Sequence, residues 1–239
     1  MMPPRLRQWS AQRAARYAAP LPPDQPLSDG DPRDIPAAAF DRQLLGADLH
    51  ARRLSAPETD AAIAVAVRDG QDLAARHAGT AQALAVQLGV RVESVAGDNR
   101  FGTIFQFAEY TAKPPRVLIY DYAMETVAEA AASHDISLLP AQPAEVYLAH
   151  ELYHHLDQLR PVTVSRAVRV TAFALGPIRL TSGLPALAEI GACAFAAALT
   201  GLPWHPRLLD LLALRTIAPA AAAAMEMALR RTANQTTAA

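Results

Sequence analysis

The chain has 239 residues, of which 51% are hydrophobic, and its formal net charge is −1. This length and apolar content predict one sizeable core, and the near-neutral charge argues against direct binding to nucleic acid or to a lipid surface. The single cysteine, Cys193, excludes an internal disulfide framework and indicates a reducing, cytoplasmic compartment.

The beginning of the chain is rich in proline, with eight of the nineteen prolines in residues 1–36. This stretch has several arginines but no unbroken apolar segment of the kind that a signal peptide needs. We therefore expect a flexible arm over 1–36, a single domain over 37–231 and a disordered tail over 232–239. Charged residues and prolines interrupt the longest apolar windows, so no membrane span is expected.

A helical pattern fills residues 37–79. Ser55 and Glu58 have the spacing of a capping box, and Gly70 is expected to interrupt the helix that follows. A further short helix is predicted over 81–88.

Alternating apolar and polar residues then predict three short strands, over 90–95, 103–110 and 116–121. Turn residues separate them, which indicates a small antiparallel or mixed sheet. A helix is expected over 122–133, so the fold class is α+β.

The segment between 161 and 182 has β-branched residues, yet a helix after Ser165 is an equal alternative. Two helices are predicted beyond it, over 207–214 and 218–231.

A further helical segment begins near Pro143 and contains His150-Glu151-x-x-His154. In a helix the two histidines lie one turn apart on the same side, where both imidazoles can bind one metal ion. Glu151 lies about 100° further round, so it can reach a water on the metal without being a ligand. Apolar residues at helical spacing seat this helix: Ala149, Leu152, Tyr153 and Leu156.

A catalytic zinc site takes three protein ligands and a water, so a third ligand is needed. No metzincin-type glycine and histidine follow the motif, and the only later glutamates are Glu189 and Glu226. Glu189 is preferred because small residues follow on its side of a helix, which lets two helices approach closely. Those residues are Ala192, Cys193 and Ala196.

The pair formed by His150-Glu151-x-x-His154 and Glu189-x-x-Ala192-x-x-Phe195-Ala196 resembles the gluzincin zinc metallopeptidases, most closely the small ImmA/IrrE-type members. The resemblance implies a mostly helical, zincin-like domain with a sheet beside the histidine helix, and a bound Zn²⁺. It also implies a protein or peptide substrate, with a separate transcriptional repressor as one such partner. Tyr153 departs from the pattern, since the family often has glycine there.

In this interpretation Glu151 is the general base that takes a proton from the attacking water. Tyr153, His155 and His205 are candidate donors to the reaction intermediate, and Asp157 is a candidate to orient a ligand imidazole. Cys193 is expected to be a small packing residue rather than a thiol near the metal.

An edge strand would hold an extended peptide beside the metal, and both the strand ending at Asp121 and the strand over 103–110 are candidates. Two other functional classes stay open. One is a zinc-stabilised regulator or binding module with little or no peptidase activity, and the other is a helical scaffold without metal.

Overall fold

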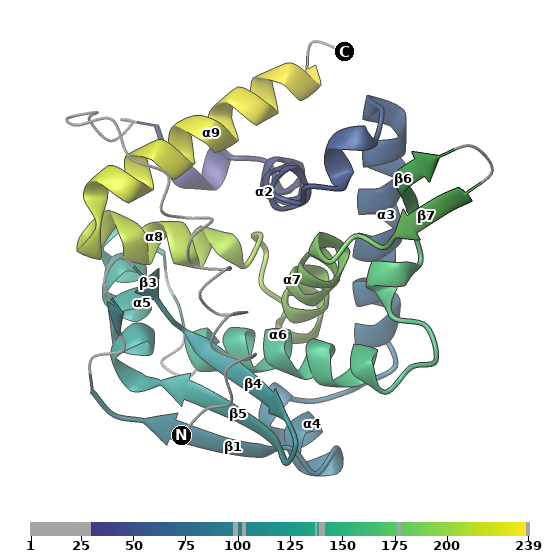
Figure 1. The fold of residues 1–239 in the computed structure, drawn as a ribbon. Helices are drawn as coiled ribbons and strands as arrows, with labels where there is room; N and C mark the ends of the chain where they lie inside the picture. Colours follow the sequence, from purple (N-terminus) through teal and green to yellow (C-terminus); the bar gives the residue numbers. More distant parts are fainter. Residues whose placement is uncertain are drawn as a thin grey trace.

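The computed structural model describes residues 30–97, 100–101, 104–136, 138, 142–175 and 178–237. Within these residues the fold is α+β, as predicted, with helices stacked above one face of a small sheet (Figure 1). Residues 1–29 of the expected arm lie outside the described part.

The main sheet has three strands, β1 (Arg91–Val95), β4 (Ala108–Ala112) and β5 (Pro115–Tyr120). β5 is central, parallel to β1 and antiparallel to β4, so the sheet is mixed. The strand predicted over 103–110 is divided, because its beginning pairs separately as a two-residue hairpin. That hairpin consists of β2 (Arg100–Phe101) and β3 (Ile104–Phe105).

One face of this sheet supports the helix that carries the histidines. Val117 and Ile119 of β5 are buried, whereas the residues that alternate with them are only partly covered. Alternate side chains of a strand point to opposite faces, so the buried pair identifies the face that packs on the core. Above it lies α6 (Gln142–Gln158), as Figure 1 shows.

The centre of the fold is α7 (Ala186–Thr200), which lies between α6 and α3 (Ala56–Ala74) (Figure 1). Its sequence is almost wholly apolar apart from Glu189, and a helix that is hydrophobic all round is expected to be buried. The start of α3 has the predicted capping box between Ser55 and Glu58.

Gly70 does not interrupt α3, contrary to our expectation. It lies inside the helix, at the point where α3 meets α7. A Cβ atom built on Gly70 would lie 2.2 Å from the carbonyl oxygen of Gly191. Glycine is therefore required here by the contact between two helix backbones.

Gly191 leaves room on the other side of α7 for a side chain of α6. A Cβ atom there would lie 2.2 Å from the hydroxyl oxygen of Tyr153 on α6. The two glycines thus let three helices approach closely, and Tyr153 is fully buried in the space that Gly191 leaves.

The remaining helices complete one continuous core. Thr80 caps the short helix that begins at Ala81, since its side chain accepts a hydrogen bond from the Ala83 amide. The α-helices not yet given are α2 (Ala37–Gly46), α4 (Ala81–Gln87), α5 (Asp121–Ser133), α8 (Arg207–Ile217) and α9 (Pro219–Thr237). The 3-10 helices are η1 (Pro32–Asp34), η2 (Ala51–Arg53) and η3 (Val164–Arg166).

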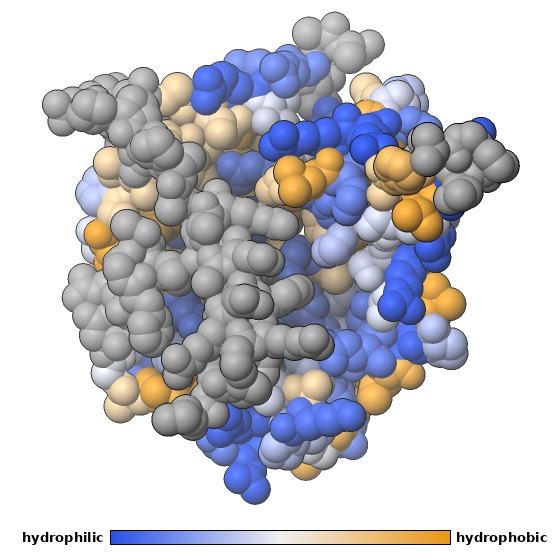
Figure 2. All heavy atoms as spheres, in the orientation of Figure 1, coloured by the Kyte–Doolittle hydropathy of each residue, from blue (hydrophilic) through white to orange (hydrophobic). Residues whose placement is uncertain are grey.

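The ambiguous segment over 161–182 contains η3 and then a hairpin of β6 (Val170–Leu175) and β7 (Ile178–Ser182). Phe173 and Leu180 are paired across this hairpin and both are at least half exposed. On the face shown in Figure 2, hydrophobic residues form separate small groups among hydrophilic ones.

Both predicted termini of the domain need correction. α9 continues to Thr237, so residues 232–237 are helical rather than disordered. Near the beginning, Pro32 and Ile35 are buried, and Arg230 of α9 donates a hydrogen bond to the carbonyl oxygen of Asp31. Residues 30–36 therefore belong to the folded part. Among the described helices, none combines the length and the apolar character that a bilayer crossing requires.

Candidate metal centre

Three predicted ligands meet where α6 faces α7. His150 Nε2 lies 3.3 Å from His154 Nε2. Glu189 places Oε2 3.5 Å from His150 Nε2 and Oε1 3.6 Å from His154 Nε2. The side chains are only 14–19% exposed, so the cluster is mostly enclosed but reaches the surface.

These distances fit one tetrahedral ion. Zinc binds imidazole nitrogen at about 2.0–2.1 Å, which separates two tetrahedral nitrogen ligands by about 3.3 Å. Carboxylate ligands are bound at about 2.0–2.2 Å, so each nitrogen–oxygen separation is expected to be about 3.3–3.5 Å. The separation of the two nitrogens agrees with the first of these values, and each nitrogen lies 3.5–3.6 Å from a different oxygen of Glu189, Oε2 for His150 and Oε1 for His154. The donor set, two imidazoles and one carboxylate, therefore suits zinc.

The hydrophobic pattern of α6 explains the direction of the histidines. Val146, Ala149 and Leu152 are fully buried, whereas His150 and His154 are partly exposed beside them. Burial of the apolar side seats the helix, so the histidine edge faces α7.

The electrostatics of the cluster favour positive charge. Burial alone lowers the pKa of His150, but hydrogen bonds with Cys193 and Glu189 and the nearby charge of Glu151 outweigh it. The pKa of His150 is therefore well above its usual value. A cluster that stabilises an imidazolium without metal presents a field that suits a cation.

Glu151 is 7% exposed and follows His150 directly on α6. One turn before His150, Tyr147 donates a hydrogen bond of 2.8 Å to Asp210 Oδ1 on α8. Burial, followed by the charge of Asp210, raises the pKa of Tyr147 well above its usual value, so this phenol stays neutral. Sequence reasoning missed Tyr147, although its spacing from His150 places it near the same helix face.

The structure places the candidate donors Tyr153 and His155 in other contacts. The Tyr153 hydroxyl donates to Asp69 Oδ2 on α3 over 2.7 Å. His155 Nδ1 lies 2.7 Å from the Tyr110 hydroxyl on β4, a contact that connects the edge of the sheet to α6.

His205 and Asp157 also make contacts with other parts of the fold. His205 stacks on Phe40 and lies 3.3 Å from Asp41. Asp157 Oδ1 accepts the Val164 amide proton, which holds the segment after α6. The contact to the second nitrogen of His150 comes from Cys193.

Glu226, the alternative third ligand, lies elsewhere. Its carboxylate is buried between α8 and α9, 2.5 Å from Arg215 and 2.8 Å from Arg230. Two guanidinium groups satisfy this acid, so Glu189 is the third residue of the cluster.

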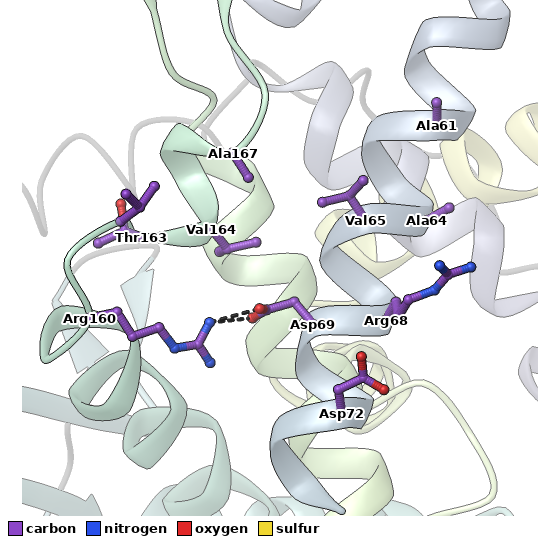
Figure 3. A pocket seen from close by; sticks show the side chains of 11 residues that line it. Ala61, Ala64, Val65, Arg68, Asp69, Asp72, Arg160, Thr163, Val164 and Ala167 are labelled. Carbon is purple, nitrogen blue, oxygen red and sulfur yellow. Dashed lines mark hydrogen bonds and ion pairs between the residues drawn. The ribbon is translucent and has the colours of Figure 1, made fainter.

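A separate cavity of about 510 Å³ lies between α3 and the segment from Arg160 to Ala167. Figure 3 shows Arg160 and Asp69 paired on its wall, with Val65 and Val164 facing each other across it. None of the three clustered residues lines this cavity.

No family model matches the chain, and neither curated proteins nor solved structures yield a significant match.

Proposed function

We propose that the protein is a zinc-dependent metallopeptidase that hydrolyses a peptide bond in a protein or peptide substrate. The observation that carries this proposal is the meeting of His150, His154 and Glu189 within 4.8 Å of one another. Two segments of the chain supply these residues, and both have the spacing that resembles gluzincins of the ImmA/IrrE type. The zincin-like character of the fold belongs to the same proposal.

Each residue of the motif has a defined task. His150, His154 and Glu189 would hold Zn²⁺, which supplies a Lewis acid and lowers the pKa of a water molecule to about 7. Glu151 accepts a proton from the attacking water and then donates it to the leaving amine. A carboxylate suits both transfers, and Glu151 is not one of the three clustered ligands.

The substrate is an extended peptide that adds to the edge of the sheet at β4. β5 is paired on both sides, so the candidate strand that ends at Asp121 has no edge of its own. β4 forms an edge of the three-stranded sheet, and the contact between Tyr110 and His155 connects it to α6. His155 directly follows the proposed ligand His154 in the sequence. A peptide paired with this edge would lie beside the cluster.

The resemblance to gluzincins of the ImmA/IrrE type also suggests a substrate and a cellular compartment for the proposed activity. It favours a separate transcriptional repressor as substrate, and a cytoplasmic site of action agrees with the single cysteine. Direct contact with nucleic acid or membrane is not part of this proposal.

The first experiment measures metal in the purified full chain. We expect one zinc per chain in the wild type and in His50→Ala, which changes a histidine outside the cluster, but no stoichiometric zinc in His150→Ala. Wild-type protein that binds no divalent metal would overturn the proposal.

The second experiment separates catalysis from binding. Unfolded casein and a mixture of synthetic peptides serve as substrates for the wild type and Glu151→Gln. We expect Glu151→Gln to retain zinc and to lose at least about 100-fold in cleavage rate, because general acid–base catalysis contributes about 10²–10⁴-fold. Equal cleavage by both proteins refutes the role of Glu151. Zinc without cleavage in either protein supports the regulatory module instead.

A further inference from the structure

Helix α7 contacts both ring nitrogens of His150. Glu189 Oε2 lies 3.5 Å from Nε2, and Cys193 Sγ lies 3.9 Å from Nδ1. Residues four apart in a helix share one face on adjacent turns. Glu189 and Cys193 therefore place two side chains of the same helix at opposite edges of one imidazole.

This arrangement matters for the tautomer of the ring. A neutral imidazole has one protonated nitrogen and one nitrogen with a free lone pair, and only the latter can bind a metal. His150 Nε2 faces His154 and Glu189, so the proton must be on Nδ1 when the metal is bound. A hydrogen-bond acceptor at Nδ1 selects this tautomer, and a thiol sulfur is a weak acceptor.

We propose that Cys193 is a positioning residue of the metal centre, whose sulfur accepts the Nδ1–H of His150 and holds Nε2 toward the other two ligands. This inference rests on the proposed zinc site. It assigns the cysteine a role that differs from simple packing.

Cys193 is not a fourth ligand in this arrangement. Its sulfur contacts the nitrogen that faces away from the cluster, and the metal-binding group found among the described residues contains His150, His154 and Glu189. The proposed zinc ion therefore keeps a fourth position for water or substrate.

Cys193 is also placed firmly enough to act on the ring. Cys193 is 2% exposed, and the nearby residues Ala192 and Ala196 of the same helix are fully buried. A side chain fixed by a buried helix restricts the rotation of His150 about its own Cβ–Cγ bond.

The test compares zinc affinity in full-length wild type, Cys193→Ala and Cys193→Ser, by competition with a chromophoric chelator. Loss of a partner of a ligating histidine costs about 10–100-fold in metal affinity, and for a weak thiol acceptor we expect about 10-fold in Cys193→Ala. Serine restores a hydrogen-bond acceptor on the same Cβ, so Cys193→Ser should bind zinc more tightly than Cys193→Ala.

Phe195→Leu is the matched control for loosening of the core. Phe195 is fully buried on the same helix, but its ring contacts are with Tyr153 and His77. We expect this variant to unfold at lower urea concentration without a change in the zinc dissociation constant.

The outcomes are distinct. Zinc binding by Cys193→Ala as tight as that of the wild type overturns the inference and leaves the proposed function intact. An equal loss in the alanine, serine and leucine variants also overturns it, because general loosening then explains the effect. Absence of zinc from the wild type overturns the proposed function itself, and the positioning role with it.

Discussion

Replacement of Gly70 by alanine tests the close contact between α3 and α7. The added Cβ would lie 2.2 Å from the Gly191 carbonyl oxygen and 2.8 Å from the Phe195 amide nitrogen. Ordinary contact begins at 3.4 Å, so the two helices must separate by about 1.2 Å. The obstructing atoms belong to a backbone, and no side-chain rotation can relieve the overlap.

The expected free-energy change has two opposing parts. Overpacking of a core costs about 1–3 kcal/mol, and the rigid backbone contact favours the upper end of this range. Alanine is about 1 kcal/mol better than glycine inside a helix. Gly70→Ala should therefore lower the free energy of unfolding by about 2 kcal/mol, which corresponds to about 4–8 °C in the melting temperature of a chain of this size.

Gly46→Ala is the control, because a Cβ on Gly46 has no neighbour within 4 Å. Gly46 ends α2, so its replacement should stabilise the protein by at most about 1 kcal/mol. Urea unfolding of both variants, with the m-value checked for a common denatured state, measures the difference. If the two variants are equally stable, the argument that glycine permits the helix contact is refuted.

Four further results are expected. Glu226→Ala leaves the guanidinium of Arg215 buried without its carboxylate and should cost about 3–5 kcal/mol in urea unfolding; a loss below about 1 kcal/mol contradicts this. Tyr110→Phe removes the hydrogen bond to His155 and should cost about 1 kcal/mol by the same assay, whereas an unchanged midpoint speaks against the contact. Burial lowers the pKa of His155, so folding favours its neutral form; this contribution to the free energy of unfolding is complete above the unfolded pKa of about 6.5 and is lost as the pH falls through the folded pKa. The free energy of unfolding should therefore decline less in His155→Gln than in the wild type between about pH 7.5 and 5.5. An equal decline in both proteins counts against this. A chelator should lower the melting temperature of zinc-loaded wild type but not of His150→Ala, because a ligand present at 100 times its dissociation constant adds about 2.7 kcal/mol; equal melting curves would exclude a stabilising metal.

The local patterns in the sequence were sufficient to predict most of the helices and strands. The spacing of His150 and His154 needs only a helix to place both on one side, and the structure has that helix. Glu189 was selected among two later glutamates, and the two helices do converge on it. Alternation predicted the three-stranded sheet, but the pairing of β1 with β5 rather than with β4 depends on contacts distant in sequence.

The contacts between helices could not be predicted in the same way. Gly70 and Gly191 are 121 residues apart, and the sequence pattern around either glycine does not show that their backbones meet. Tyr153 fits between α6 and α7 because Gly191 leaves space for its ring. Its hydroxyl then donates to Asp69 on α3, so Tyr153 connects two helices. Helical spacing gives the direction of a side chain relative to its neighbours but not its partner.

The bond from Arg230 to the Asp31 carbonyl has a consequence for biosynthesis. These residues are separated by 199 positions, and a Cβ at Gly30 would lie 2.7 Å from the same guanidinium. During translation the chain emerges from its first residue onward, so Asp31 must wait for α9 before it can reach its final place. The bond to Asp31 thus forms only after α9 has been synthesised, and a chain that ends before Arg230 lacks it.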